Sequence, residues 1–208
     1  MWTPAEEPVA ACVVAHGAGA GSRTPFFDGV CAGLTAAGVS CLRFDFPYTL
    51  AGRRAPDRPP VLIGAWREAL AVAAERAAGV PIVASGKSLG GRMASMLAAE
   101  EGTAFAAGAL VFFGYPLHAP GRVDALRVEH LSRVTVPMLF IQGTSDALGR
   151  FDLVEETVRS LSPRASLYAV RGGDHSFRVR GTKRPDAEIG RELGGVAAAF
   201  IREVVGGS

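Results

Sequence analysis

The amino-acid sequence predicts an α/β protein, a three-layer α/β/α sandwich around a mostly parallel sheet of about six strands. Apolar runs of strand length alternate with segments of helical periodicity from one end of the chain to the other. These runs are apolar nearly throughout, as expected of strands that helices cover on both faces. The 208 residues suffice for one sizeable core, so we expect a single domain over residues 1–208.

The N-terminal half of the chain begins with a strand and a clearly marked helix. Residues 8–15 (PVAACVVA) form an apolar run that ends at a glycine-rich turn. A helix is expected over residues 25–37, because Thr24 can cap it, Pro25 suits its first position and Gly38 suits its end. Next come a strand at 39–46, a loop with four prolines at 47–60, a helix at 63–78 and a strand at 80–85.

The C-terminal half continues the alternation. Leu89, Met93 and Leu97 recur at the i, i+4, i+8 spacing of one helix face. Because the segment between the fourth and fifth strands is short, no large lid is expected over the sheet. The remaining expected elements are strands at 107–113, 136–142 and 166–170, a helix with an apolar stripe at Leu153, Val154, Thr157, Val158 and Leu161, and a final helix at 187–204.

Composition and charge exclude several classes of protein. Apolar residues make up 49% of the chain and charged residues 20%, which is ordinary for a globular protein and unlike a disordered one. The formal net charge of +2 is too small for a dedicated nucleic-acid binder. The longest uncharged stretch, residues 103–121, has an apolar centre too short to span a bilayer. We therefore expect a small-molecule partner, and neither nucleic acid nor a membrane.

The expected location is the cytoplasm. Residues 1–11 (MWTPAEEPVAA) have no basic region and place two glutamates before the first apolar run, unlike a signal peptide. Cys12, Cys31 and Cys41 are odd in number and lie in apolar runs, so we expect reduced thiols in the core. Neither a CxxC nor an HxxxH spacing occurs in the sequence, so no metal site is expected.

A nucleophile motif follows the strand at 80–85. The segment Gly86-Lys87-Ser88-Leu89-Gly90 fits G-x-S-x-G between a strand and a helix, the context that this motif requires. The turn from strand to helix is so sharp that only small side chains fit beside the serine, which accounts for the two glycines. The backbone N–H of Leu89, at the start of the helix, would face an oxyanion formed at Ser88.

Two further strands end at residues that complete a catalytic set. Asp146 lies in the turn after the strand at 136–142, and His175 lies in the turn after the strand at 166–170. With Ser88 they have the chain order Ser, Asp, His, and each follows the carboxyl end of a strand, where parallel sheets bind ligands. The turn after the first strand (HGAGAG) can supply a second oxyanion-hole N–H, that of Ala18.

In these motifs the chain resembles the α/β-hydrolases, in particular the small, lidless, dienelactone-hydrolase-like members. The resemblance extends over nearly the whole chain, through HGAGAG, RFDFPY, GKSLGGR, GYPLHAPG, QGTSDALG and GGDHSF. It implies an α/β-hydrolase fold without a large lid and the activity of a serine esterase. The chain departs from the family at Ala147, where many members have a proline after the triad aspartate.

The motifs and the resemblance together predict a serine hydrolase that cleaves small or accessible carboxylic esters. Ser88 would be the nucleophile, His175 its general base, and Asp146 the residue that orients His175. The N–H groups of Ala18 and Leu89 would form the oxyanion hole. An acyl-enzyme would form and water would hydrolyse it, with no metal or organic cofactor implied.

Other readings of these residues stay open. Ser88 could be a simple helix N-cap, and Asp146 could cap the next helix. Asp124, after the fourth strand, is an alternative acid. Asp174 is another, although the side chains of neighbours in sequence, such as Asp174 and His175, usually diverge.

The other histidines and the basic residues near the motifs also have expected roles. His16 is expected to fix the first turn, and His118 and His130 are expected on the surface or packed within a loop. A cationic cleft would favour anionic esters. The candidates for such substrate binding are Lys87, Arg92, Arg53 and Arg54.

Two other function classes compete with the esterase. A catalytically silent hydrolase fold could serve as an interaction module, since a fold alone does not establish function. A nucleotide-binding protein is the second, because Gly86-Lys87-Ser88 is similar to the end of a P-loop and Gly17-x-Gly19 with Asp45 is similar to a dinucleotide site. Against it stand Pro81, in place of the first P-loop glycine, and Ser22, in place of the third dinucleotide-motif glycine.

Overall fold

A single sheet forms the centre of the molecule. The computed structural model describes residues 1–207, and within them the strands lie in the order β1-β3-β2-β4-β5-β6-β7. Strand β1 pairs with β3 in the antiparallel direction, and the other neighbouring strands are parallel. The strands are β1 (Trp2–Thr3), β2 (Ala10–Ala15), β3 (Val39–Phe44), β4 (Ile82–Lys87), β5 (Leu110–Phe113), β6 (Met138–Gly143) and β7 (Ala165–Val170).

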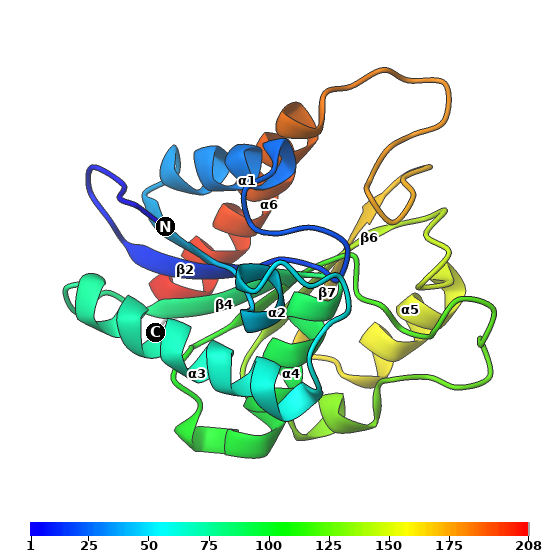
Figure 1. Ribbon diagram of the computed structural model, residues 1–208, viewed down its shortest axis with the longest axis horizontal. Helices are drawn as coiled ribbons and strands as arrows, with labels where there is room; N and C mark the ends of the chain where they lie inside the picture. The colour runs from blue at the N-terminus through cyan, green and yellow to red at the C-terminus, as the bar shows by residue number, and fades with distance from the viewer. Residues whose placement is uncertain (208) are drawn as a thin grey trace.

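Helices cover both faces of this sheet (Figure 1). Helices α1 (Pro25–Thr35) and α6 (Asp186–Gly206) lie side by side on one face. The other face carries α3 (Pro59–Arg76), α4 (Leu89–Glu101) and α5 (Phe151–Ser160). The short elements are α2 (Pro47–Leu50), η1 (Gly102–Ala104) and η2 (Glu129–Arg133). This arrangement confirms the predicted three-layer sandwich.

Alternate side chains of the strands build two apolar cores. In β2, Val13 and Ala15 pack on the side of α3 and α4, whereas Cys12 and Val14 pack on the side of α1 and α6. All four side chains are fully buried. Because successive side chains of a strand point to opposite faces, only an uninterrupted apolar run can serve both cores. The helices cover both faces of the sheet, and the loops of the candidate site follow the carboxyl ends of the parallel strands.

Helices α1 and α6 pack with their backbones in direct contact. Gly29 and Gly33 of α1 meet Gly190 and Gly194 of α6. A Cβ atom at any of these positions would overlap backbone atoms of the facing helix. Larger residues here would therefore push the two helices apart.

The structure corrects the expected elements near the N-terminus and after β3. Strand β1 is a seventh strand that was not expected, because its two residues are too few to show a periodic pattern. Residues 47–60 are not a continuous loop, because Pro47–Leu50 form the short helix α2. Helix α3 begins at Pro59, earlier than expected. Proline suits the first turn of a helix, because the N–H that it lacks would have no partner there.

The cysteines also differ from expectation. Cys31 of α1 and Cys41 of β3 form a disulfide, and Cys12 is a buried free thiol. The expectation of three reduced thiols is therefore wrong for Cys31 and Cys41. Disulfides are typical of oxidising compartments, so this pairing lends no support to a cytoplasmic location, which stays a prediction.

Candidate active site

Ser88 occupies a sharp turn between β4 and α4. Its φ of 50° and ψ of −116° lie in a region that residues other than glycine rarely adopt. The residue stands at the N-cap position of α4, but its side chain makes no capping hydrogen bond. The structure therefore does not support a simple N-cap role, and the hydroxyl is free for other contacts at the carboxyl edge of the sheet.

The flanking glycines allow this turn because backbones approach closely on both sides of it. A Cβ atom at Gly90 would lie 2.6 Å from the carbonyl oxygen of His16 and 2.7 Å from that of Ala15. A Cβ atom at Gly86 would lie 2.5 Å from the carbonyl carbon of Gly90. The start of α4 is thus pressed against the end of β2, which brings the HGAGAG turn next to Ser88.

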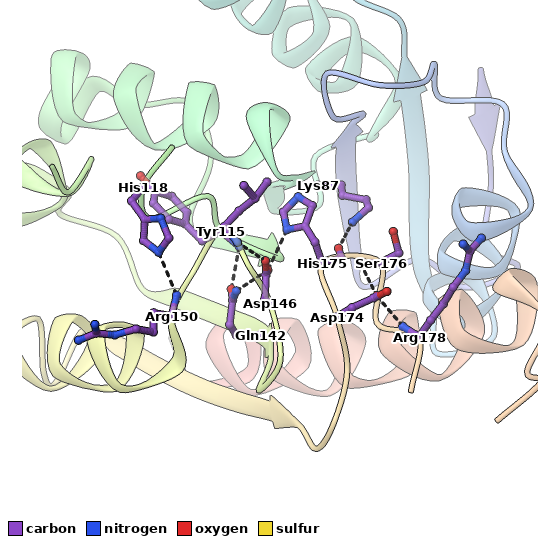
Figure 2. Close-up of polar contacts among 11 residues, drawn as sticks. Lys87, Tyr115, His118, Gln142, Asp146, Arg150, Asp174, His175, Ser176 and Arg178 are labelled. Atoms are coloured by element: carbon purple, nitrogen blue, oxygen red, sulfur yellow. Dashed lines mark hydrogen bonds and ion pairs between the residues drawn. The ribbon is translucent and has the colours of Figure 1, made fainter. Parts of the chain in front are cut away.

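Asp146 and His175 form a hydrogen-bonded pair beside this turn. The Nδ1 atom of His175 lies 2.8 Å from Oδ2 of Asp146 (Figure 2). The Asp146 side chain is fully buried, whereas 25% of the His175 side chain is exposed. With Nδ1 bonded to the carboxylate, Nδ1 carries the proton of the neutral ring, and Nε2 is the nitrogen able to accept another.

Gln142, a residue that the sequence analysis did not single out, completes the surroundings of Asp146. Its Nε2 donates to Oδ2 of Asp146 at 2.7 Å, and its Oε1 accepts the N–H of Tyr115 at 2.8 Å (Figure 2). The N–H of Leu148 donates to Oδ1 of Asp146 at 2.8 Å. Both carboxylate oxygens therefore accept hydrogen bonds, which fixes the plane of the carboxylate toward His175. Asp146 does not cap α5, whose N-cap residue is Arg150.

A cavity of about 400 Å³ brings the candidate residues together. Ser88 and His175 both line it, although each comes from a different strand end. Its walls come from the turn after β2, the first turn of α1, the loops after β4, β6 and β7, and the start of α6. The lining residues are Gly17, Ala18, Gly19, Ala20, Thr24, Phe26, Phe27, Lys87, Ser88, Leu148, His175, Ser176 and Asp186.

Two backbone N–H groups next to Ser88 are the candidates for an oxyanion hole. Leu89 is the first residue of α4, so its N–H has no partner within the helix. Within residues 1–207, the N–H of Ala18 makes no hydrogen bond. Both donors belong to segments beside Ser88, which is the placement that an oxyanion hole requires.

The alternative acids are directed elsewhere. Asp124 is exposed and pairs with Arg122 at 3.7 Å. Asp174 uses Oδ1 to accept the N–H groups of Ser176 at 2.7 Å and Arg178 at 3.0 Å. In Figure 2 the side chains of Asp174 and His175 point in different directions. Only Asp146 contacts the His175 ring among the three carboxylates.

His16 fixes the first turn, in line with the expectation. The ring is fully buried, and its Nε2 accepts the N–H of Phe46 at 3.0 Å. Its Nδ1 then carries the proton and donates to the carbonyl of Gly17 at 2.7 Å. Burial lowers the pKa of His16, which favours this neutral form.

His118 is buried and His130 is half-buried, so both pack within the molecule, which is one of the two placements expected for them. His118 is buried, and its Nε2 accepts the N–H of Arg150 at 3.2 Å (Figure 2). His130 Nε2 lies 2.8 Å from Oγ of Ser95 and 3.3 Å from the hydroxyl of Tyr115. Burial lowers the pKa of His130 to about 4. Neither histidine lines the cavity.

Of the four basic candidates for substrate binding, only Lys87 lines the cavity with Ser88. Arg53 and Arg54 line a neighbouring hollow on the far side of the HGAGAG turn, and Arg53 is paired with Asp57 at 2.7 Å. Arg92 lines neither space. A preference for anionic esters stays a prediction.

The nucleotide-binding alternative does not fit the structure. Strand β4 runs through Lys87 up to the turn at Ser88, so no phosphate-cradling loop precedes α4. Asp45 accepts the N–H of Ser22 at 2.6 Å and so stabilises the turn after β2. The described residues contain no cluster of three or more side chains placed to hold a metal ion. None of their helices is long and apolar enough to cross a bilayer.

Comparisons with solved structures show proteins of the same fold. A dienelactone hydrolase from Anabaena variabilis superposes with a TM-score of 0.76 at 20% sequence identity, covering 97% of this chain and 89% of the other. Est1E from Butyrivibrio proteoclasticus with ferulic acid bound superposes with a TM-score of 0.73 at 18% sequence identity, covering 99% of this chain and 94% of the other. A serine hydrolase without a lid from Xanthomonas campestris superposes with a TM-score of 0.72 at 18% sequence identity, covering 96% of this chain and 84% of the other.

At these identities the solved structures establish the fold alone. The family relationship rests on a separate finding, a match of residues 8–203 to a family model described as an alpha/beta hydrolase domain. Because this match spans nearly the whole chain, the protein belongs to the α/β-hydrolase family.

Proposed function

We propose that the protein is a serine hydrolase that cleaves small or accessible carboxylic esters through an acyl-enzyme. The observation that supports this most directly is the shared cavity of Ser88 and His175, with Nδ1 of His175 bonded to the buried Asp146. The strained backbone at Ser88 is a second support, because such strain gathers at active sites.

The first half of the reaction forms the acyl-enzyme. Oγ of Ser88 attacks the ester carbonyl carbon while Nε2 of His175 takes the hydroxyl proton. The carbonyl oxygen becomes an oxyanion that accepts hydrogen bonds from the N–H groups of Ala18 and Leu89. Asp146 stabilises the imidazolium, which then gives its proton to the departing alcohol oxygen as the carbon–oxygen bond breaks.

The second half releases the acid. A water molecule attacks the acyl carbon and His175 takes its proton. The tetrahedral intermediate collapses, the bond to Ser88 Oγ breaks, and the imidazolium returns a proton to that oxygen. In residues 1–207 no hydrogen bond joins Ser88 to the His175 ring, so we propose that this contact tightens when the ester binds, as is common at hydrolase sites.

The walls of the cavity suggest the size and polarity of the acyl group. Phe26, Phe27 and Leu148 give it apolar sides. The segment between β5 and β6 folds as η2 and short turns, and it does not line the cavity. We propose that short or compact acyl groups fit, and that the alcohol portion extends into solvent.

A fluorophosphonate probe and a series of p-nitrophenyl esters test the proposal. The probe should label the wild-type protein at Ser88 and leave Ser88→Ala unlabelled. Hydrolysis should be fastest for short acyl chains and fall once the chain exceeds the cavity. An absence of both labelling and hydrolysis would reject the esterase and support the alternative of a silent hydrolase fold.

A further inference from the structure

Lys87 links the nucleophile strand to the loop that carries the candidate base. Its Nζ donates a hydrogen bond of 2.6 Å to the carbonyl oxygen of His175 (Figure 2). In residues 1–207 this is the only hydrogen bond at the His175 backbone, since the N–H of His175 makes none. The two residues are 88 positions apart in the sequence, so the contact depends on the fold and not on local chain geometry.

The surroundings of Lys87 direct its ammonium group to this contact. Nζ lies 5.6 Å from the ring centroid of Phe26 and 5.1 Å from that of Phe177. Aromatic faces attract a cation but accept no strong hydrogen bond from it. Within residues 1–207, no carboxylate forms an ion pair with Lys87. The His175 carbonyl is therefore the principal acceptor for this ammonium group.

The rest of the His175 loop is held in a different way. Asp174 accepts N–H groups of Ser176 and Arg178, which shapes the loop internally. The N–H of Ser145 donates to the carbonyl of Gly173 at 2.9 Å, which ties the loop to the turn of the acid. Lys87, the residue directly before Ser88, supplies a second tie through its hydrogen bond to the His175 carbonyl.

From this geometry we propose that Lys87 is a positioning residue, whose ammonium group fixes the backbone of His175 and so sets the approach of its imidazole to Ser88. The role rests on the proposed serine-hydrolase function, but the contact between Lys87 and His175 can be tested separately from it. Because one strand end carries both Lys87 and Ser88, the nucleophile and its base keep a fixed relation even though they lie on different loops.

The charge of Lys87 makes this positioning depend on pH. Burial lowers the pKa of Lys87 to about 8, although Asp146, Asp174 and Asp186 favour the ammonium form and Arg178 opposes it. Above this pH the charge is lost and the hydrogen bond to His175 weakens, so kcat should decline on the alkaline side in the wild-type protein.

Three variants separate positioning from packing. Lys87→Met keeps the length of the side chain but removes the donor and the charge, whereas Lys87→Arg keeps both. Lys183→Met is the matched control, because Lys183 is an exposed lysine outside the cavity. We measure kcat and KM with p-nitrophenyl acetate, the pH dependence of kcat/KM, and the melting temperature.

Lys87→Met should lower kcat by about 10²-fold, the loss typical of a misplaced reacting group, with KM changed by less than about twofold. The alkaline decline of kcat should disappear, because the variant has no ammonium group to lose. Lys87→Arg should recover most of kcat, and Lys183→Met should match the wild type. A kcat within about threefold of wild type in a folded Lys87→Met protein, or an alkaline decline like that of the wild type, would overturn the proposal.

An NMR measurement of the His175 carbonyl carbon, assigned with His175→Gln, gives a result that needs no ester hydrolysis. Its signal should move in Lys87→Met, which removes the donor to this carbonyl, and stay unchanged in Lys183→Met. If the wild type neither hydrolyses esters nor binds the fluorophosphonate, the proposed function fails while this change still supports the link from Lys87 to His175. An unchanged carbonyl signal in Lys87→Met overturns the link whatever the esterase assay shows.

Discussion

Gln142 Nε2 donates a hydrogen bond of 2.7 Å to Oδ2 of Asp146, the oxygen that also bonds His175. The amide therefore helps to decide which way the carboxylate faces. Since Gln142 is fully buried and also accepts the Tyr115 N–H, its side chain has little freedom to turn. A polar residue at the end of an otherwise apolar strand thus acts on the candidate base through one intermediate residue.

Replacing Gln142 should impair both activity and stability. Gln142→Leu removes the donor to Asp146 and leaves the buried N–H of Tyr115 without an acceptor. We expect kcat to fall by about tenfold, and the free energy of unfolding to fall by about 1–3 kcal/mol for the unpaired buried group. Ester hydrolysis and urea unfolding measure the two effects.

Thr157→Val is the control for a purely structural loss, since Thr157 is buried in α5 and, within residues 1–207, its hydroxyl bonds only to Leu153 of the same helix. It should lower stability without lowering kcat. Equal kcat values for Gln142→Leu and Thr157→Val would contradict a role of Gln142 at the site.

The backbone at Ser88 predicts an unusual order of stabilities. In both Ser88→Ala and Ser88→Gly, kcat for ester hydrolysis should fall by about 10²-fold or more, because the nucleophile is absent. Only glycine adopts a φ of 50° with a ψ of −116° without strain. The free energy of unfolding should therefore be about 1 kcal/mol higher for Ser88→Gly than for Ser88→Ala, a difference that urea denaturation can resolve. A more stable alanine variant would show that the turn carries no strain.

The three candidate acids should differ sharply when each is changed to asparagine. Asp146→Asn should lower kcat by about 10²-fold or more, because an amide in place of the carboxylate no longer fixes the reactive tautomer of His175. Asp174→Asn should have little effect, since Oδ1 can still accept the N–H groups of Ser176 and Arg178. Asp124→Asn changes an exposed residue and is the matched control. A larger loss from Asp124→Asn than from Asp146→Asn would move the acid to the end of β5.

His130 predicts a loss of stability in acid. Its pKa is lowered from 6.5 to about 4, first by burial and further by Arg92 and Arg133. The unfolded chain therefore binds this proton more readily than the folded protein does. Below about pH 6.5 the free energy of unfolding should fall as the pH approaches 4, and this contribution should be fully present above pH 6.5.

Urea unfolding at pH 7.0, 5.5 and 4.5 measures the His130 effect. His130→Gln keeps a polar group for Ser95 and Tyr115 but does not titrate, so its stability should fall less steeply over this range. Identical slopes for the wild type and His130→Gln would assign the acid sensitivity to other groups.

The fold could be predicted from the sequence because its strands are apolar on both faces and its helices are marked by stripes and caps. Thr24 illustrates the local signal: its Oγ1 accepts the N–H of Phe27 at the start of α1. Strand β1 could not be predicted, since two residues carry no pattern, and it forms by pairing with β3 and by packing of Trp2 against the core. Helix α2 was hidden in a proline-rich segment that was expected to be a loop.

The same limit applies to the candidate site. Ser88, Asp146 and His175 stand out because each follows a strand in a recognisable turn. Gln142 left only a weak signal, a single amide in the run MLFIQG. The contact from Lys87 to His175 left none, because a hydrogen bond across 88 residues has no signature in the sequence. Such residues come together because neighbouring parallel strands end side by side at one edge of the sheet.

The glycine contact between α1 and α6 reaches the cavity. Phe26 and Phe27 in the first turn of α1 and Asp186 at the start of α6 all line it. A Cβ atom at Gly190 would overlap the carbonyl oxygen of Phe26. The position of the α1 lining residues relative to Asp186 is therefore set by two touching backbones and not by adjustable side chains. Gly190→Ala would displace Phe26 and Phe27 and so reshape the cavity, although it changes none of the residues that line it.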